Sequence, residues 1–299
     1  MTVALLYIGT VLIWGSTWLA VKMQLGLVAP EVSIAYRFAI AAALLLVYSI
    51  ARRRRLRFSL RDHAGMALLG LLLFSGNYIV FYMASGIMTT GLVAVVFSGM
   101  VVTNIIFGAI FFGTPVRPRV AVGAGSGISG LAMIFWPEVS TFDLASDGTV
   151  GLLLCIAGTV LASLGNMVSV SNQRRGLPVL QANAYGMSYG AAFMTLTALF
   201  NGRTFDFDPS LLYTGSLLYL AIFGSVFGFG FYLTLLGRIG ADRAAYATVL
   251  FPIIALGLST VFENFQWSSG AVAGMVLVLG GNVLVLSRTI KRKPKQVAA

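Results

Sequence analysis

The run VALLYIGTVLIWGSTWLAVK, residues 3–22, contains no acidic residue and a single basic residue, which stands at its end. A helix crosses the hydrocarbon core of a bilayer with about 20 residues of this kind. We therefore predict a membrane-spanning helix over 3–22. Nine further apolar runs follow it, and the ten predicted spans are 3–22, 31–51, 64–84, 89–112, 119–136, 149–171, 179–200, 211–235, 243–262 and 269–288.

The composition of the whole chain predicts an all-α integral membrane protein. Of its 299 residues, 58% are hydrophobic and 10% are charged, and the mean hydropathy is +0.91. A soluble domain carries more polar residues than this. Strands of a membrane β-barrel would alternate over about ten residues, and these runs do not. The first run has no basic segment before it and no cleavage site after it, so we interpret it as a retained helix.

The distribution of charge predicts the orientation in the membrane. The net charge is +11, but the basic residues cluster between apolar runs, which is typical of a polytopic protein and not of a nucleic-acid-binding one. An even number of spans places both termini on one side. If that side is cytoplasmic, 17 of the 20 Lys and Arg residues lie inside and seven of the nine acidic residues lie outside. We predict a multi-pass protein of the bacterial inner membrane with cytoplasmic termini.

Reactive and ionisable side chains are scarce in the predicted spans. A single cysteine, Cys155, and a single histidine, His63, exclude disulfide scaffolds and Cys/His metal sites, and we predict no cofactor. No Asp or Glu lies near the centre of a span, which argues against an intramembrane enzyme. It also favours facilitated diffusion or exchange over proton coupling, although the peripheral Glu31 and Glu263 remain alternatives.

An internal repeat divides the chain into two halves. Gly9-Thr10-Val11-Leu12 recurs as Gly158-Thr159-Val160-Leu161, and Phe81-Tyr82 recurs as Phe231-Tyr232. Gly123 and Gly130 correspond in the same way to Gly274 and Gly281, at a nearly constant offset of about half the chain. We predict two five-helix repeats, 1–140 and 141–299, the second inverted because five is odd. Such repeats are typical of secondary transporters with a site at the repeat interface, and a duplicated membrane scaffold or enzyme is the alternative.

Several short motifs resemble those of one transporter family. They are Trp14-Gly15-Ser16-Thr17-Trp18 with Lys22, Arg37-Phe38, Phe81-Tyr82-Met83-Ala84, and the segment Ala247 to Glu263 with Phe251-Pro252 and Phe262-Glu263. Together they resemble the drug/metabolite transporter superfamily, the ten-helix exporters with two EamA-type repeats. The segment Phe97-Ser98-Gly99-Met100-Val101 lacks the proline and the following glutamate of its counterpart. This departure, with the many aromatic residues, is similar to the bacterial aromatic amino-acid exporter branch.

The resemblance implies export of amino acids or related amphipathic metabolites by alternating access. It places the cavity among the spans over 3–22, 64–84 and 89–112 and their counterparts over 149–171, 211–235 and 243–262. A carrier for another metabolite or a cationic drug is the alternative within the class, and a channel is a further one.

Aromatic, hydroxyl and amide side chains within these spans are the candidate binding residues. Polar groups in a span tend to face protein or a water-filled path, and rings can stack a flat substrate or attract its ammonium group. The alternative for each is ordinary packing between helices. The candidates are Trp14, Ser16, Asn77, Tyr78, Tyr82, Phe97, Ser98, Ser163, Asn166, Phe227, Tyr232 and Tyr246.

Three charged residues near span ends complete the set of candidates. Lys22 is the first candidate for a substrate carboxylate, ahead of Arg37, and the alternative for both is snorkelling to the membrane surface. Glu263 is a candidate gating residue, or else it caps or pairs at a helix end. Glycines spaced four apart at Gly123 and in the last span predict close packing of the fifth and tenth spans, or a dimer contact. We expect a monomer or a weak homodimer.

Overall fold

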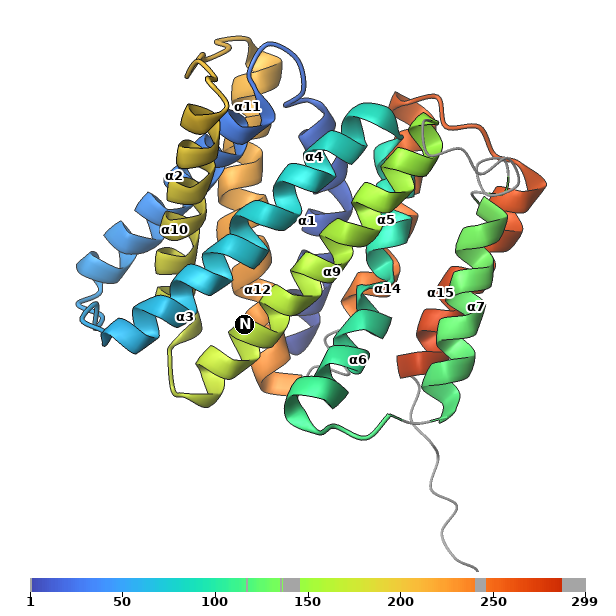
Figure 1. Ribbon diagram of the computed structural model, residues 1–299, viewed down its shortest axis with the longest axis horizontal. Helices are drawn as coiled ribbons and strands as arrows, with labels where there is room; N and C mark the ends of the chain where they lie inside the picture. Colours follow the sequence, from blue (N-terminus) through green and yellow to red (C-terminus); the bar gives the residue numbers. More distant parts are fainter. Residues whose placement is uncertain (1, 117, 135, 137–145, 240–245, 287–299) are drawn as a thin grey trace, which may run out of the picture.

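The computed structural model describes residues 2–116, 118–134, 136, 146–239 and 246–286, and the regular structure in these ranges is entirely helical (Figure 1). The first part of the chain forms α1 (Val3–Lys22), α2 (Pro30–Ala51), α3 (Leu60–Leu71), η1 (Leu72–Gly76), α4 (Asn77–Ile87), α5 (Thr90–Ser98), α6 (Met100–Phe112) and α7 (Pro118–Ile134). The second part forms α9 (Asp147–Arg174), α10 (Val179–Phe200), α11 (Leu211–Tyr219), η2 (Leu220–Phe227), α12 (Gly228–Ile239), α14 (Tyr246–Phe262) and α15 (Ser269–Leu286).

Helix occupies each of the predicted spans, and the described residues contain six segments long and apolar enough to cross a membrane. These segments are Val3–Lys22, Pro30–Ala51, Leu60–Ile87, Thr90–Phe112, Asp147–Arg174 and Leu211–Leu235. Shorter apolar helices cover Val122–Ile134, Leu250–Phe262 and Ser269–Leu284. The chain is therefore an all-helical membrane protein over its described part.

Two spans contain a π-helical segment that the hydrophobic pattern did not predict. In η1 the Ser75 hydroxyl donates to the carbonyl of Gly70 at 3.0 Å, and in η2 the Ser225 hydroxyl donates to the carbonyl of Leu220 at 3.0 Å. Each serine thus bonds a carbonyl five residues earlier, which is the reach of a π-helical turn. Ser75 and Ser225 are separated by the offset of the predicted repeat.

The helices of the two halves pack mainly against each other. In Figure 1, α2 lies beside α10, α4 beside α9, and α7 beside α15, and these pairs make extensive contacts, as do α1 and α14. The largest core cluster joins Phe38 and Phe74 from the first half to Phe229 and Tyr232 from the second. A space between the halves is therefore lined by residues far apart in the sequence.

Glycines allow α7 and α15 to touch backbone to backbone. A Cβ atom on Gly130 would lie 2.5 Å from the carbonyl oxygen of Gly274, and one on Gly274 would lie 2.5 Å from that of Gly130. A Cβ on Gly281 would lie 2.5 Å from the carbonyl oxygen of Gly123. Only glycine fits at these positions, so the small-residue faces of α7 and α15 pack against each other within one chain.

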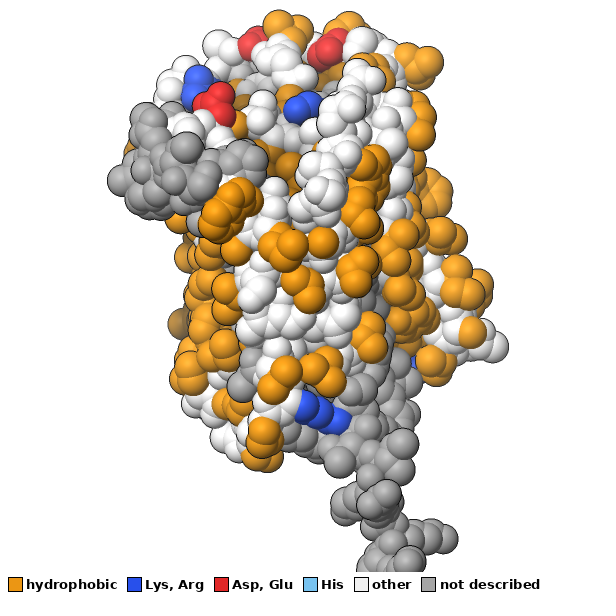
Figure 2. All heavy atoms as spheres, turned by 90° about the vertical axis from the view of Figure 1, so that its right-hand side faces the viewer, with side chains coloured by type: hydrophobic (Ala, Val, Ile, Leu, Met, Phe, Trp, Pro, Cys, Tyr) orange, Lys and Arg blue, Asp and Glu red, His pale blue; other side chains and the backbone are white. Residues whose placement is uncertain are grey.

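One face of the molecule is apolar along its middle and charged toward its ends. Figure 2 shows hydrophobic side chains down this face, with both acidic and basic side chains near its top and basic ones near its bottom. Among the exposed residues are Leu12, Ile110 and Val276, at 56%, 67% and 61% exposure. Lipid tails can cover such a surface without loss of hydrogen bonds, whereas its exposure to water carries a large free-energy cost.

Candidate functional site

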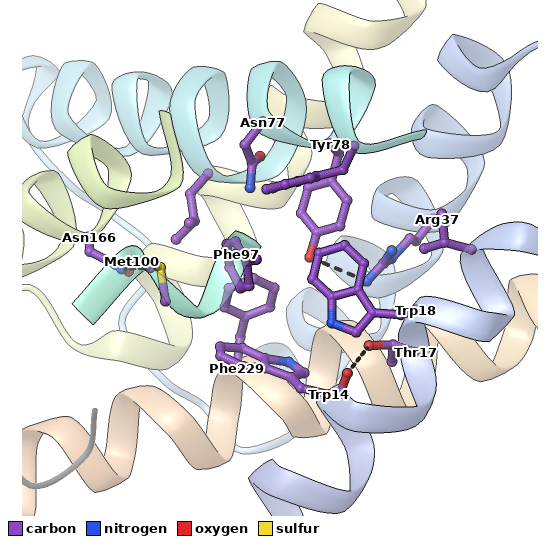
Figure 3. A pocket seen from close by; sticks show the side chains of 13 residues that line it. Trp14, Thr17, Trp18, Arg37, Asn77, Tyr78, Phe97, Met100, Asn166 and Phe229 are labelled. Carbon is purple, nitrogen blue, oxygen red and sulfur yellow. Dashed lines mark hydrogen bonds between the residues drawn. The ribbon is translucent and has the colours of Figure 1, made fainter. Parts of the chain in front are cut away.

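A cavity lies between the two halves and is bordered by α1, α2, η1, α4, α5, α6, α9 and α12 (Figure 3). The empty space between its lining atoms is about 560 Å³, and part of this space is open to solvent. Its aromatic lining residues are Trp14, Trp18, Tyr78, Phe81, Phe97 and Phe229, its polar ones Thr17, Arg37, Asn77 and Asn166, and its aliphatic ones Val21, Leu73 and Met100.

Three rings from three helices form one wall of the cavity. The Trp18 ring of α1 lies 5.3 Å from Phe81 of α4 and 5.3 Å from Phe97 of α5, and those two phenyl rings lie 5.1 Å apart. All three contacts are edge-to-face, the arrangement that the ring quadrupoles favour. Trp14 packs edge-on against Phe229 of α12 at 5.2 Å. The site therefore offers rigid aromatic surface to a flat or apolar ligand.

Arg37 is the charged residue of this cavity, and it is only 2% exposed. Its Nε donates to the Ser225 hydroxyl at 3.0 Å, and its Nη2 donates to the Tyr78 hydroxyl at 3.4 Å. Its guanidinium carbon lies 4.5 Å from the centre of the Tyr78 ring, and its Nη1 has no partner among the described residues. The guanidinium is thus anchored on one side by two hydroxyls, and the π-helical turn of η2 supplies one of them.

Lys22, expected ahead of Arg37 as the anion-binding residue, lies elsewhere. Its Nζ donates to the backbone carbonyl of Ser85 at 2.7 Å, and it is not among the residues that line the cavity. Snorkelling to the membrane surface was one of the two interpretations of Arg37, but the structure buries it between α2, α4 and η2. The sequence did contain one sign of this, because Arg37 lies inside the run 31–51, six residues after the start of the predicted span.

Five of the predicted binding residues line the cavity. They are Trp14, Asn77, Tyr78, Phe97 and Asn166. The Asn77 amide is 3% exposed, and its oxygen has no hydrogen-bond partner among the described residues. The Asn166 amide nitrogen lies 3.2 Å from the Met100 sulfur and 3.4 Å from the Asn104 oxygen. The amides can therefore contact a ligand at the cavity surface.

Three other predicted residues lie behind this lining. Tyr82 and Tyr232 are buried, at 0% and 2% exposure, and the Tyr232 ring packs 4.8 Å from Trp14. The Ser163 hydroxyl donates to the Asn104 side-chain oxygen at 2.7 Å. These side chains support the lining residues and do not border the cavity themselves.

Three more of the predicted residues do not line the cavity, namely Ser16, Ser98 and Phe227. The Ser16 hydroxyl bonds the Tyr219 hydroxyl at 2.6 Å, and Phe227 is 43% exposed on the outer surface. The Ser98 hydroxyl donates to the Val95 carbonyl at 2.6 Å and accepts from Asn282. The side chain of Tyr246 lies outside the described part of the chain.

Glu263 joins α14 to the first turn of α5. Its carboxylate accepts from the Thr90 backbone N–H at 3.0 Å and from the Thr90 hydroxyl at 2.6 Å, and the Ser259 hydroxyl also donates to it. The Ser259 hydroxyl in turn accepts from the Gly91 N–H at 2.7 Å. The first N–H groups of a helix lack partners within the helix, so Glu263 and Ser259 cap α5 from the opposite half.

Sequence reasoning missed several lining residues. Val21, Leu73, Met100 and Phe229 are ordinary apolar residues of the spans, and nothing in their local pattern sets them apart from lipid-facing neighbours. Trp18 was named only as part of the motif Trp14-Gly15-Ser16-Thr17-Trp18, and the structure places it at 8% exposure in the aromatic wall.

The chain matches a known family of transporters and several of its members. The EamA-like transporter family matches residues 1–136 and 149–287. The chain is 26% identical to the "Uncharacterized inner membrane transporter YedA" of Escherichia coli K12, over 90% of this chain and 87% of that protein. It is 24% identical to the "Uncharacterized transporter YvbV" of Bacillus subtilis, over 97% of this chain and 93% of that one.

Two further matches concern a third relative and the fold. The chain is 23% identical to the protein PagO of Salmonella typhimurium, over 97% of this chain and 94% of PagO. A solved crystal structure matches with a TM-score of 0.68 at 20% identity and covers 94% of this chain and 95% of its own, so the fold is shared. The family match extends over nearly the whole chain, and the chain belongs to the EamA family of membrane transporters, within the drug/metabolite transporter superfamily.

Proposed function

We propose that this transporter exports small amphipathic metabolites, aromatic or apolar amino acids among them, through the cavity between its halves. The observation that carries the proposal is the aromatic wall of Trp18, Phe81 and Phe97, which lies beside the polar groups of Asn77 and Arg37. A ligand with an apolar body and a polar end matches such a lining. A cationic drug fits less well, because the charged group at the cavity is itself a cation.

Alternating access by two inverted repeats, 1–140 and 141–299, is the proposed mechanism. Paired contacts support it: a Cβ on Gly9 would lie 2.8 Å from the Phe231 ring, and one on the corresponding Gly158 would lie 2.8 Å from the Phe81 ring. The matching π-helical turns and the reciprocal glycine contacts of α7 and α15 also fit a pseudo-two-fold relation. Rocking of one half against the other would expose the cavity to each side in turn.

Facilitated diffusion or exchange is the proposed energetic mode. No acidic side chain lines the cavity within the described residues, so nothing there offers the titrating carboxylate that proton coupling generally uses. We further propose the bacterial inner membrane as the location, with cytoplasmic termini, and a monomer, since the glycine faces of α7 and α15 pack within one chain. YedA, a relative, is named as an inner membrane transporter.

Reconstitution into proteoliposomes tests the proposal. Vesicles loaded with labelled phenylalanine, tryptophan or leucine should release at least one of them by saturable flux that unlabelled substrate inhibits. Trp18→Ala should raise the KM, because it removes one ring of the aromatic wall. Trp267→Ala is the matched control, since Trp267 lies outside the cavity and donates to Thr260. Absence of saturable flux for any amphipathic metabolite would reject the function.

A further inference from the structure

We propose that Arg37 binds the anionic group of the substrate, so that the preferred substrates are aromatic or apolar monoanions such as monocarboxylates. This inference rests on the proposed function for its transport step, because it names the substrate class of the same cavity. The binding step stands on the structure alone. Its basis is a buried cation that borders the cavity and lacks a counter-charge among the described residues.

The charge balance around Arg37 is incomplete. A buried charge is costly unless an opposite charge compensates it, and Ser225 and Tyr78 are neutral hydroxyls. The ion pair that the described residues contain joins Arg203 to Glu31 at 3.6 Å and does not include Arg37. Glu31 lies on the same helix, but the Asn201 amide also binds it, at 3.1 Å.

The other described acidic side chains are engaged or placed elsewhere. Asp62 bonds Ser59, Asp206 bonds Thr204, Asp208 bonds the Ser210 N–H, Glu263 bonds Thr90, and Asp147 lies in the first turn of α9. None of them lines the cavity. A bound anion would therefore supply the compensating charge that the described part of the protein does not.

The geometry leaves donors for that anion. A guanidinium carries five N–H groups, and Arg37 directs two of its nitrogens to hydroxyls while Nη1 keeps no partner among the described residues. The Tyr78 hydroxyl accepts from Nη2, so its own proton remains to be donated. Figure 3 shows the Tyr78 hydroxyl and the Arg37 guanidinium directed toward each other at the cavity. A carboxylate beside them can accept from both residues, as charge-assisted hydrogen bonds require.

The net charge of the ligand follows from the same lining. An amino acid would bring a carboxylate for Arg37 and also an ammonium group, but none of the acidic side chains that the structure describes lines the cavity. The aromatic faces and the unpartnered Asn77 amide oxygen would attract that ammonium, but neither carries the full opposite charge of a buried ion pair. The corresponding acid without the amino group leaves the site neutral. We therefore expect a deaminated aromatic acid to bind more tightly than the amino acid, and an amine to bind least.

Arg37 also has a structural interpretation, as a tie between α2, η2 and α4. That interpretation predicts that loss of the arginine weakens the protein and affects every ligand alike. Anion binding predicts instead that the effect depends on the charge of the ligand. A ligand series of constant shape and varying charge separates the two.

The experiment uses the purified full-length protein in lipid nanodiscs and four phenyl ligands, measured by isothermal titration calorimetry. The ligands are 3-phenylpropanoate, phenylalanine, 3-phenylpropanamide and phenethylamine, which are anionic, zwitterionic, neutral and cationic. The wild-type protein should bind 3-phenylpropanoate about tenfold or more tightly than the neutral amide. Equal affinities for the two would overturn the inference without any substitution.

Variants then assign the preference to Arg37. Arg37→Gln should weaken binding of the anion by about 10- to 100-fold and leave the amide nearly unchanged, whereas Arg37→Lys should retain part of the preference. Ser225→Ala removes a partner of the guanidinium and keeps the charge, so the preference for the anion should persist. Equal loss for anion and amide in Arg37→Gln would show a structural tie and refute anion binding.

The outcome for the inference is separate from that for the transport function. Saturable flux of phenylalanine with the same KM in the wild type and in Arg37→Gln would leave the transport function standing and overturn anion binding. A wild type that binds the anion preferentially but moves none of the four ligands would uphold the site and reject the transport assignment. If Arg37→Gln fails to fold, the wild-type ligand series and Arg37→Lys still decide the question.

Discussion

Replacing Glu263 with alanine should remove the cap that α14 places on α5. Thr89, the residue before α5, makes no side-chain cap of its own, so the carboxylate is the acceptor for the Thr90 N–H and hydroxyl. Loss of a helix cap costs about 0.5–2 kcal/mol, and loss of a negative charge at a helix N-terminus costs about 0.3–1 kcal/mol. We expect Glu263→Ala to lower the free energy of unfolding by about 2 kcal/mol, and Glu263→Gln by about half as much.

Equilibrium unfolding by SDS in mixed micelles, followed by tryptophan fluorescence, measures this difference. Gln266→Ala is the matched control, because Gln266 is exposed in the same loop and bonds only the nearby Asn264 carbonyl. It should change stability by less than about 0.5 kcal/mol. If Glu263→Ala were as stable as this control, the carboxylate would not be capping α5.

The same substitution tests whether Glu263 acts as a gate. Since α5 and α14 belong to opposite halves, the contact must open if the halves separate at this end. A loss of about 2 kcal/mol would shift that equilibrium about 30-fold. Electron paramagnetic resonance distances between spin labels at positions 89 and 264, in a protein whose Cys155 is replaced, would report the shift. An unchanged distance distribution would show a cap that does not gate.

Three other substitutions test the packing and the site. Gly130→Val should lower the free energy of unfolding by about 1–3 kcal/mol, because the new side chain meets the backbone of α15. Gly125→Ala should be neutral or stabilising, because nothing lies within 4 Å of its new Cβ. Thermal denaturation compares the two variants. Ser225→Ala should lower the free energy of unfolding by about 1–3 kcal/mol, because it removes an acceptor from the buried Arg37 guanidinium. Ser75→Ala should lower it less, because the Ser75 hydroxyl bonds only local carbonyls. Unfolding in SDS measures both variants, and equal losses of stability would contradict this reasoning. Gly158→Ala should weaken ligand binding in calorimetry, because the new Cβ would lie 2.8 Å from the ring of Phe81, which lines the cavity, and would displace it. An unchanged affinity would show that the ring has room to move.

The helices could be predicted closely from the sequence, because span length is set by the thickness of the bilayer. The predicted ranges 3–22 and 179–200 coincide with α1 and α10, and 211–235 begins where α11 begins. The π-helical turns were missed, since a run such as Leu220–Phe227 is apolar except for Ser225 and has no periodicity that distinguishes a π turn from an α turn.

The candidate site could be predicted only in part. Trp14, Asn77 and Asn166 were found because polar or amphipathic side chains are unusual inside a span. Phe227 was predicted to bind substrate, but it does not line the cavity and is 43% exposed. A phenylalanine is equally stable against lipid and in a protein core, so composition cannot decide which way it faces.

Hydrophobicity and the positions of charge determined by themselves that this chain crosses a membrane as helices, because each span must satisfy its own backbone hydrogen bonds in lipid. The tertiary structure alone decided that Arg37 and not Lys22 borders the cavity. Both residues are single cations near the end of an apolar run. Their roles differ because Ser225 and Tyr78, which are distant in sequence from Arg37, hold its guanidinium in the protein interior, while the Ser85 carbonyl holds the Lys22 ammonium away from the cavity.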